Sequence, residues 1–249
     1  MSDNDDKGTP PPAPFAAPDR LALLLDFDGT LVEIAPRPDA IAVPADLPDR
    51  LARLHRRLSG ALAVVSGRAV SDLRTYLPDF PGDILGSHGA EHAAAGSEPR
   101  ILAPTDGLAD LRKAITVYAK GHPDLLVEDK THSVVLHYRA APDMAHDVSA
   151  FMEALAGRHP AFAVQPAKMA VELRPAGADK GSAVARLLET RPFAGRLPVY
   201  AGDDTTDEAA MQVAQERGGA GIKIGPGDSV ATYRLHGPAD LYDWLDKAV

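Results

Sequence analysis

A run of five apolar residues, Leu21–Leu25, leads directly into two acidic residues, Asp26 and Asp28, which only Phe27 separates. A continuous apolar run of strand length is typical of a parallel strand that other elements cover on both faces. Two like charges at a spacing of two residues on such a strand repel each other. A conflict of this kind between burial and charge usually marks a functional site. The feature therefore predicts an α/β sheet with an acidic site at a strand end.

The residues after this run repeat the alternation of strand and helix. Leucines recur every three or four residues from Leu47 to Leu58, which indicates an amphipathic helix, and Ala61–Val65 is a second apolar strand. The β-α-β order implies a parallel sheet with right-handed crossovers. The same alternation returns near the C-terminus, with strands predicted at Leu197–Ala201 and Ala220–Ile224. We therefore expect an α/β fold with a doubly wound parallel sheet.

The middle of the chain follows a different pattern, which predicts two consecutive α-β-β units. Helices are expected at residues 106–120 and 143–157, and strands at 125–129, 133–138, 161–165 and 169–173. We interpret residues 91–175 as an α+β domain inserted into a core of residues 20–90 and 176–249. Residues 1–19 combine an acidic cluster with proline-rich sequence, so we expect a disordered, mobile tail.

Charge and composition exclude several classes of protein. The chain has 26 basic and 35 acidic side chains, a formal charge of −9, which is the wrong sign for nucleic acid binding. It has no cysteine, which excludes disulfides, thiolate metal sites and a cysteine nucleophile. No apolar run approaches the roughly 20 residues that span a bilayer. The N-terminus lacks the pattern of a signal peptide. We expect a cytoplasmic monomer with a small-molecule substrate and neither a nucleic acid nor a membrane partner.

Polar residues follow the predicted core strands where ligands bind in open parallel sheets, at the carboxyl ends. Taken alone, each residue could be a helix cap, a turn residue or a solvated side chain. Together they predict one site. The residues are Asp26 with Asp28, Ser66, Lys180 at a helix start, and the cluster of Asp203, Asp204 and Asp207.

The chemistry that fits these residue types is phosphoryl transfer through an aspartyl phosphate. An ionised aspartate such as Asp26 can attack phosphorus without a base if a cation reduces its repulsion with the phosphate. Mg²⁺ suits this role because it prefers oxygen ligands and can share the phosphate as a ligand. Lys180 would add positive charge and Ser66 a hydrogen bond. Asp28 could protonate the leaving alkoxide and later deprotonate water.

The segments DFDGTL, SGR, ADKGS and GDDTTDE resemble, in this order, the four motifs of the haloacid dehalogenase superfamily of phosphatases. The resemblance implies that Asp26 is the nucleophile and Asp28 the acid/base, with Ser66 and Lys180 as phosphate contacts. Further substrate contacts implied by these motifs are Gly29, Thr30, Gly67 and Arg68. The implied magnesium ligands are Asp26, Asp28 through its carbonyl, Asp203, and Asp207 through water.

A finer resemblance is to the trehalose-phosphate phosphatase family. It rests on GSHGAE (residues 86–91), VEDKTHSVVLHYR (127–139), VELRPAGADKG (171–181) and GDDTTDE (202–208). It implies magnesium-dependent hydrolysis of trehalose 6-phosphate, with Glu128, Lys130, Glu172 and His88 as substrate contacts. The alternation in residues 168–174 independently places Glu172 on the side of its strand away from the apolar residues.

Other functions also use some of these residue types. Within phosphatases, the alternatives are relatives that act on sucrose phosphate or hexose phosphates, and a phosphomannomutase-like phosphotransferase. A glycosyltransferase also uses Asp-x-Asp, but that motif needs a nucleotide-binding half before it, and only 25 residues precede Asp26. A signalling receiver domain also phosphorylates an aspartate, but it needs no inserted domain. The glycine-rich segment Gly219–Gly225 runs through a predicted strand without opening a helix, which disfavours a dinucleotide site.

Overall fold

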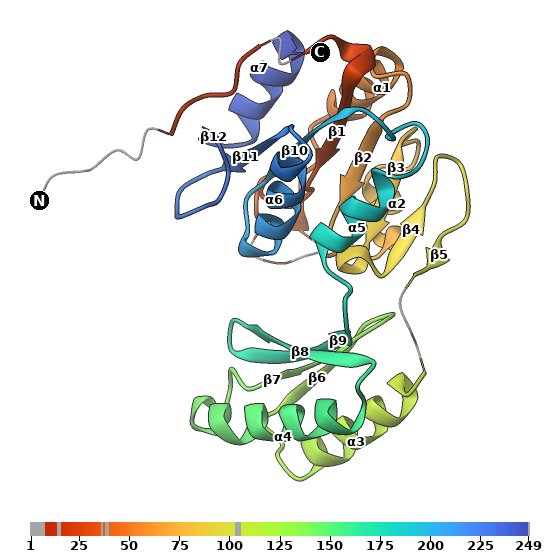
Figure 1. Cartoon of the computed structure of the whole chain (residues 1–249). Helices are drawn as coiled ribbons and strands as arrows, with labels where there is room; N and C mark the ends of the chain where they lie inside the picture. Colours follow the sequence, from red (N-terminus) through yellow and green to blue (C-terminus); the bar gives the residue numbers. More distant parts are fainter. Residues whose placement is uncertain (1–7, 14–15, 36, 38–39, 103–105, 249) are drawn as a thin grey trace, which may run out of the picture. The chain divides into compact units, whose positions relative to one another are not determined.

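The apolar run before Asp26 forms strand β1 (Leu21–Leu25), which lies inside the larger of two sheets in this computed structural model (Figure 1). The structure describes residues 8–13, 16–35, 37, 40–102 and 106–248. Every residue of β1 is buried, as expected for a strand that is covered on both faces.

Within the described residues, the larger sheet has eight strands, mostly parallel. Side by side they are β12 (Tyr233–Leu235), β11 (Ala220–Ile224), β10 (Leu197–Gly202), β1, β2 (Leu62–Val65), β3 (Asp83–Gly86), β4 (Glu91–Ala93) and β5 (Arg100–Ile101). The pairings from β12 to β3 are parallel, whereas β4 is antiparallel to β3. The carboxyl ends of β10, β1 and β2 therefore lie at one edge of the sheet.

Helices cover both faces of this sheet, which confirms the doubly wound fold. They are α1 (Leu47–Arg57), α2 (Val70–Tyr76), α5 (Lys180–Leu187), α6 (Glu208–Glu216) and α7 (Pro238–Ala248). Leu21, Leu23 and Leu25 belong to a buried cluster with residues of α1, α2 and α7. Ala22 and Leu24, which point the other way, pack with α5 and α6. Burial on both faces explains the continuous apolar run in β1.

A separate antiparallel sheet confirms the two α-β-β units. Its strands lie in the order β6 (Leu126–Asp129), β7 (Val134–His137), β9 (Ala170–Pro175) and β8 (Phe162–Ala167). Helices α3 (Leu108–Lys120) and α4 (Ala145–Arg158) pack on one face of this sheet, in a cluster that includes Leu111, Met152 and Leu173. The opposite face carries the polar residues that alternate with the apolar ones.

These two sheets belong to two compact units, residues 1–100 with 179–249, and residues 101–178. The predicted inserted domain begins at residue 91, whereas β4, which starts there, pairs with β3 in the larger sheet.

Within the predicted tail, the carbonyl of Thr9 accepts a hydrogen bond from the backbone of Arg234. The carbonyl of Pro12 accepts one from the indole of Trp244. The rest of the predicted tail, residues 1–7, 14 and 15, lies outside the described residues. Among the helices that the structure describes, none is both long and apolar enough to cross a membrane.

Candidate active site

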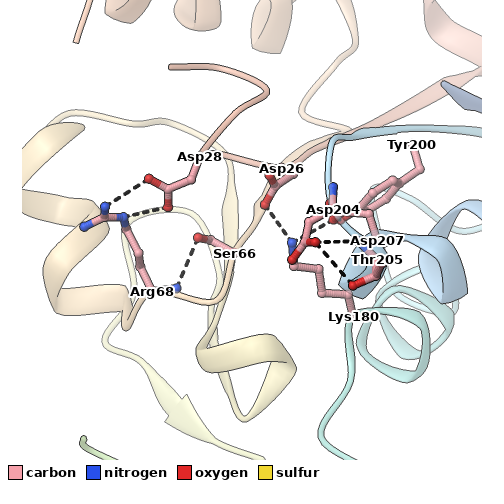
Figure 2. Close-up of polar contacts among 9 residues, drawn as sticks. All are labelled: Asp26, Asp28, Ser66, Arg68, Lys180, Tyr200, Asp204, Thr205 and Asp207. Carbon is pink, nitrogen blue, oxygen red and sulfur yellow. Dashed lines mark hydrogen bonds and ion pairs between the residues drawn. The ribbon is translucent and has the colours of Figure 1, made fainter. Parts of the chain in front are cut away.

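The predicted catalytic residues of the core unit meet at the carboxyl edge of the larger sheet. Asp26 follows β1, Ser66 follows β2 and Asp203 follows β10. Helix α5 adds Lys180 as its first residue, and the side chain of Asp179 caps this helix by accepting a hydrogen bond from the backbone of Ser182. Figure 2 shows Asp26, Ser66 and Lys180 together in this region. Three strand ends and one helix start therefore contribute to one site.

Lys180 links two carboxylates at the centre of this site. Its Nζ lies 2.7 Å from Oδ1 of Asp26 and 2.7 Å from Oδ1 of Asp207. All three side chains are buried. Burial opposes the charged form of the amine, but the charges of the two carboxylates outweigh this effect, so the pKa of Lys180 lies above its ordinary value. Lys180 is therefore a permanent positive charge at neutral pH.

Asp26 and Asp203 lie where negative charge accumulates. Burial raises the pKa of Asp26 well above its usual value, Lys180 acts against this shift, and Asp207 and Asp203 add to it. Burial, followed by the charges of Asp207 and Asp204, raises the pKa of Asp203 to about 6. Carboxylate oxygens of Asp26, Asp203 and Asp207 lie within 4.8 Å of one another. An all-oxygen donor set with this excess of negative charge fits Mg²⁺.

The oxygens of Asp207 are largely occupied by protein donors. Besides Lys180, Oδ1 accepts a hydrogen bond of 2.6 Å from the hydroxyl of Tyr200, and Oδ2 accepts one of 3.0 Å from the backbone of Asp204. The side chain of Asp204 in turn accepts from the backbone of Thr205, and Asp204 and Asp207 together form a capping box. Asp204 thus has a local structural role, and Asp207 positions Lys180.

The carboxylate of Asp28 turns toward Arg68 rather than toward Asp26 (Figure 2). Arg68 donates to it twice, through Nε at 2.7 Å and Nη2 at 2.9 Å. The backbone N–H of Arg68 also donates to Oγ of Ser66 at 3.2 Å. One residue of the SGR segment therefore contacts both the proposed acid/base and the proposed phosphate contact.

The other predicted core residues lie around the same edge. Gly29 has a φ of +76°, and a Cβ there would lie 2.1 Å from a carboxylate oxygen of Asp203, so only glycine fits. In the described part of the chain, the buried hydroxyl of Thr30 has no hydrogen-bond partner. A Cβ at Gly67 would lie 2.6 Å from the ring of His88, so that ring packs directly on the SGR segment.

Three predicted substrate contacts belong to the other unit, where the structure brings them together. The register places Glu128, Val135 and Glu172 opposite one another on β6, β7 and β9, so their side chains share a face. Nζ of Lys130 lies 3.3 Å from Oε1 of Glu172. This oxygen also accepts a hydrogen bond of 2.5 Å from Ser133.

Several residues that contact these groups are not among the predicted site residues. Tyr200 supports Asp207, and burial followed by the charge of Asp207 raises the pKa of Tyr200, which keeps its proton available for donation. Lys223 donates to the backbone carbonyl of Asp203. His137 lies 2.8 Å from Glu128. A lysine inside the apolar strand GIKIG was a detectable signal, because a buried lysine needs a partner.

A trehalose-phosphatase family profile matches residues 24–239 of the chain. A probable trehalose-phosphate phosphatase of Sinorhizobium fredii is 43% identical over 211 residues, which cover 84% of this chain and 79% of the relative. The trehalose-6-phosphate phosphatase of Escherichia coli is 35% identical over 228 residues, which cover 91% and 86%.

Solved structures show the same relationship in three dimensions. A trehalose-6-phosphate phosphatase related protein superposes with a TM-score of 0.72 at 27% identity, covering 91% of this chain and 95% of that one. A haloacid dehalogenase-like hydrolase of Bacteroides thetaiotaomicron shares the fold, with a TM-score of 0.65 at 17% identity and coverage of 92% and 99%.

Proposed function

The chain belongs to the trehalose-phosphatase family, and from this membership we infer that it hydrolyses trehalose 6-phosphate to trehalose and inorganic phosphate. It is then a phosphoric monoester hydrolase that acts last in trehalose synthesis. The fold is that of the haloacid dehalogenase-like hydrolases. The expected cytoplasmic location and monomeric state remain predictions.

The contact of Lys180 with Asp26 supports this proposal most directly. A buried ammonium at 2.7 Å from a carboxylate positions a positive charge where an attacking oxygen meets a phosphoryl group. Ser66 follows the adjacent strand, so its hydroxyl can add a hydrogen bond to a phosphoryl oxygen. A site built this way suits a dianionic ester whatever its leaving group.

In the proposed reaction, a carboxylate oxygen of Asp26 attacks phosphorus and the bond from phosphorus to the sugar oxygen breaks. Asp28, in its protonated form, gives its proton to that oxygen, which leaves as a hydroxyl of trehalose. The carboxylate that results is the form that Arg68 binds at two points. Asp28 then takes a proton from water, which attacks the aspartyl phosphate. Inorganic phosphate leaves and the carboxylate of Asp26 is restored.

The donor set at the sheet edge supports a magnesium requirement. When bound, Mg²⁺ neutralises negative charge shared by the nucleophile and the phosphate. Asp26 and Asp203 would hold it through carboxylates, Asp28 through its backbone carbonyl and Asp207 through water. Because Asp207 already accepts from Lys180, Tyr200 and Asp204, a contact through water suits it better than a direct one.

We assign recognition of the sugar to the unit of residues 101–178, the cap. Glu128, Lys130 and Glu172 supply charged hydrogen-bonding groups on one side of its sheet. Such groups match the hydroxyls of a disaccharide. In the core, Gly29, Thr30, Gly67, Arg68 and His88 are the further proposed substrate contacts.

A phosphate-release screen with Mg²⁺ present tests the function. The substrates are trehalose 6-phosphate, sucrose 6-phosphate, glucose 6-phosphate and mannose 6-phosphate. We expect kcat/KM for trehalose 6-phosphate to exceed the others by about 100-fold or more, the discrimination that a site built to bind hydroxyls can reach. A preference for sucrose or hexose phosphates would replace the substrate assignment, and transfer of phosphate between sugar positions would indicate a mutase.

A further inference from the structure

The turn of residues 86–91, with the sequence GSHGAE, contacts two elements that carry proposed phosphate contacts. The backbone N–H of Ser87 donates to the carbonyl of Arg68 at 2.7 Å, and that of His88 donates to the carbonyl of Ser66 at 3.0 Å. On the side of α5, Arg186 donates to the carbonyl of Gly89. The turn therefore joins the loop that holds Ser66 to the helix that begins with Lys180.

The backbone of the turn is held in an unusual conformation. Ser87 and His88 have φ angles of 49° and 54°, in the left-handed region that non-glycine residues rarely adopt. Gly89 follows with a φ of +94°, and a Cβ there would lie 2.5 Å from the side chain of Ala183 in α5. Such a conformation persists only when surrounding contacts fix it.

The carboxylate of Glu91 supplies such contacts. Its Oε2 accepts a hydrogen bond of 2.7 Å from the backbone N–H of Val70, and its Oε1 accepts one of 3.2 Å from the hydroxyl of Ser87. Val70 begins α2, directly after the segment that contains Ser66 and Arg68. Glu91 is buried, and a buried carboxylate is costly unless it is hydrogen-bonded. The side chain thus binds Ser87 within the turn and links the turn to the start of α2, which follows the loop of Ser66.

We propose that Glu91 is a positioning residue that, through the turn of residues 86–91, fixes the hydroxyl of Ser66 relative to the ammonium of Lys180 so that both bind one phosphoryl group. This inference rests on the proposed phosphatase function. Glu91 itself does not touch the substrate, because a bare carboxylate would repel the phosphate. Its effect is therefore the same for every phosphate ester and for any oxyanion that occupies the phosphoryl position.

The same hairpin offers a matched control at its opposite end. Asp83 begins β3, whereas Glu91 pairs with Gly86 at the end of that strand. Asp83 is buried to a similar degree, 7% exposed against 5% for Glu91. It accepts hydrogen bonds from the ring of His92 and the backbone of Ala95. Asp83→Ala therefore removes a comparable buried carboxylate from the same hairpin, away from the proposed phosphate site.

The experiment compares Glu91→Ala, Glu91→Gln and Asp83→Ala in the full chain with Mg²⁺. It measures kcat/KM for trehalose 6-phosphate and for p-nitrophenyl phosphate, the inhibition constant of orthovanadate, and Tm. Glu91→Ala should weaken orthovanadate inhibition and lower both kcat/KM values by about ten-fold to a hundred-fold, as expected for a lost hydrogen bond to a charged group. Glu91→Gln should stay within a few-fold of the parent, because its amide oxygen can accept from Val70 and its amide nitrogen can donate to Ser87.

Asp83→Ala should lower Tm without changing the inhibition constant, which does not depend on the amount of folded enzyme. If Glu91→Ala behaved like Asp83→Ala, Glu91 would only support the fold and the inference would be wrong. If Glu91→Ala does not fold, Glu91→Asp carries the test, because its shorter side chain cannot reach both donors; unchanged inhibition in that variant would also refute the inference. A parent chain that hydrolyses neither ester would instead refute the proposed function.

Discussion

The guanidinium group of Arg68 binds the carboxylate of Asp28 at two points, with Nε 2.7 Å from Oδ2 and Nη2 2.9 Å from Oδ1. The guanidinium carbon also lies 5.2 Å from the centre of the Tyr76 ring. Arg68 is therefore held by a planar, two-point contact and by an aromatic face, which a lysine cannot reproduce. The proposed acid/base takes its orientation from a residue expected to contact substrate.

Arg68→Lys should consequently lower kcat/KM although it keeps the positive charge. We expect a loss of roughly ten-fold for trehalose 6-phosphate and for p-nitrophenyl phosphate, which corresponds to about 1.5 kcal/mol for one charged hydrogen bond. Steady-state kinetics on both substrates check this. Arg74→Lys, on helix α2 and paired with Glu98 away from the site, is the control and should change neither value. Unchanged kinetics for Arg68→Lys would mean that the pair does not orient Asp28.

Asp26→Asn should abolish turnover without unfolding the chain. The amide keeps the shape of the side chain but cannot attack phosphorus, so kcat should fall by more than about 1,000-fold. Lys180 keeps Asp207 as a partner, and removal of one buried negative charge relieves the repulsion that helps raise the pKa of Asp26. The Tm of the metal-free variant should therefore equal or exceed that of the parent. Substantial residual activity would exclude Asp26 as the nucleophile.

The acidic cluster should make stability depend on pH and on magnesium. In the folded, metal-free chain the pKa of Asp203 is raised to about 6, first by burial and then by Asp207 and Asp204. A carboxyl with a raised folded-state pKa stabilises the fold below its unfolded value and loses this contribution as pH rises through the folded value. The contribution of Asp203 to the free energy of unfolding should therefore decrease as the pH rises from about 4 to about 6.5.

Magnesium should reverse this loss, because it needs the deprotonated carboxylate. We expect Mg²⁺ to raise Tm more at about pH 7.5 than at about pH 5. Thermal unfolding with and without Mg²⁺ at the two pH values measures the difference, and Asp203→Asn should remove most of it. Equal Tm shifts at both pH values would contradict the role of Asp203.

Chelation should also abolish activity until Mg²⁺ is restored, whereas Ca²⁺ should support little turnover because its coordination shell is larger and looser.

Elements buried on both faces could be predicted from sequence because their apolar runs leave few alternatives. The predicted strands at β1, β2 and β11 match the observed ones within one residue. In contrast, α2, β3 and β4 were missed. They are short, β3 contains a charged residue, Asp83, and β4 contains both Glu91 and His92. Their polar residues have partners that only the folded chain supplies, such as Ala95 and Val70.

The candidate site likewise has features that could be predicted from the sequence and features that could not. The motifs placed Asp26, Ser66 and Asp203 at one edge of the sheet because each follows a strand end, and Lys180 joins them as the first residue of a helix. The partners of individual atoms could not be predicted in this way. The capping role of Asp204 depends on the local turn, and the pairing of Arg68 with Asp28 joins residues 40 positions apart.

The cap residues can be tested against a control on the same strand, because neighbouring residues of a strand lie on opposite faces of the sheet. Glu128 lies on β6 opposite Val135, on the face of the sheet that also carries Glu172. Asp129, the next residue, points to the other face and pairs with Arg112 of α3. Asp129→Ala is therefore a matched control for Glu128→Ala.

We predict that Glu128→Ala, Lys130→Ala and Glu172→Ala each lower kcat/KM for trehalose 6-phosphate by roughly ten-fold to a few hundred-fold, since each unpaired polar group costs about 1 to 3 kcal/mol. Hydrolysis of p-nitrophenyl phosphate should stay close to that of the parent, because this ester lacks the hydroxyls that the cap would bind. Glu172 also accepts from Ser133 and contacts Lys130, so Glu172→Gln and the Tm of each variant separate recognition from folding. Asp129→Ala should leave both activities unchanged. Parallel losses on the two esters would place these residues in support of the fold, and no loss on either would place recognition of the sugar elsewhere.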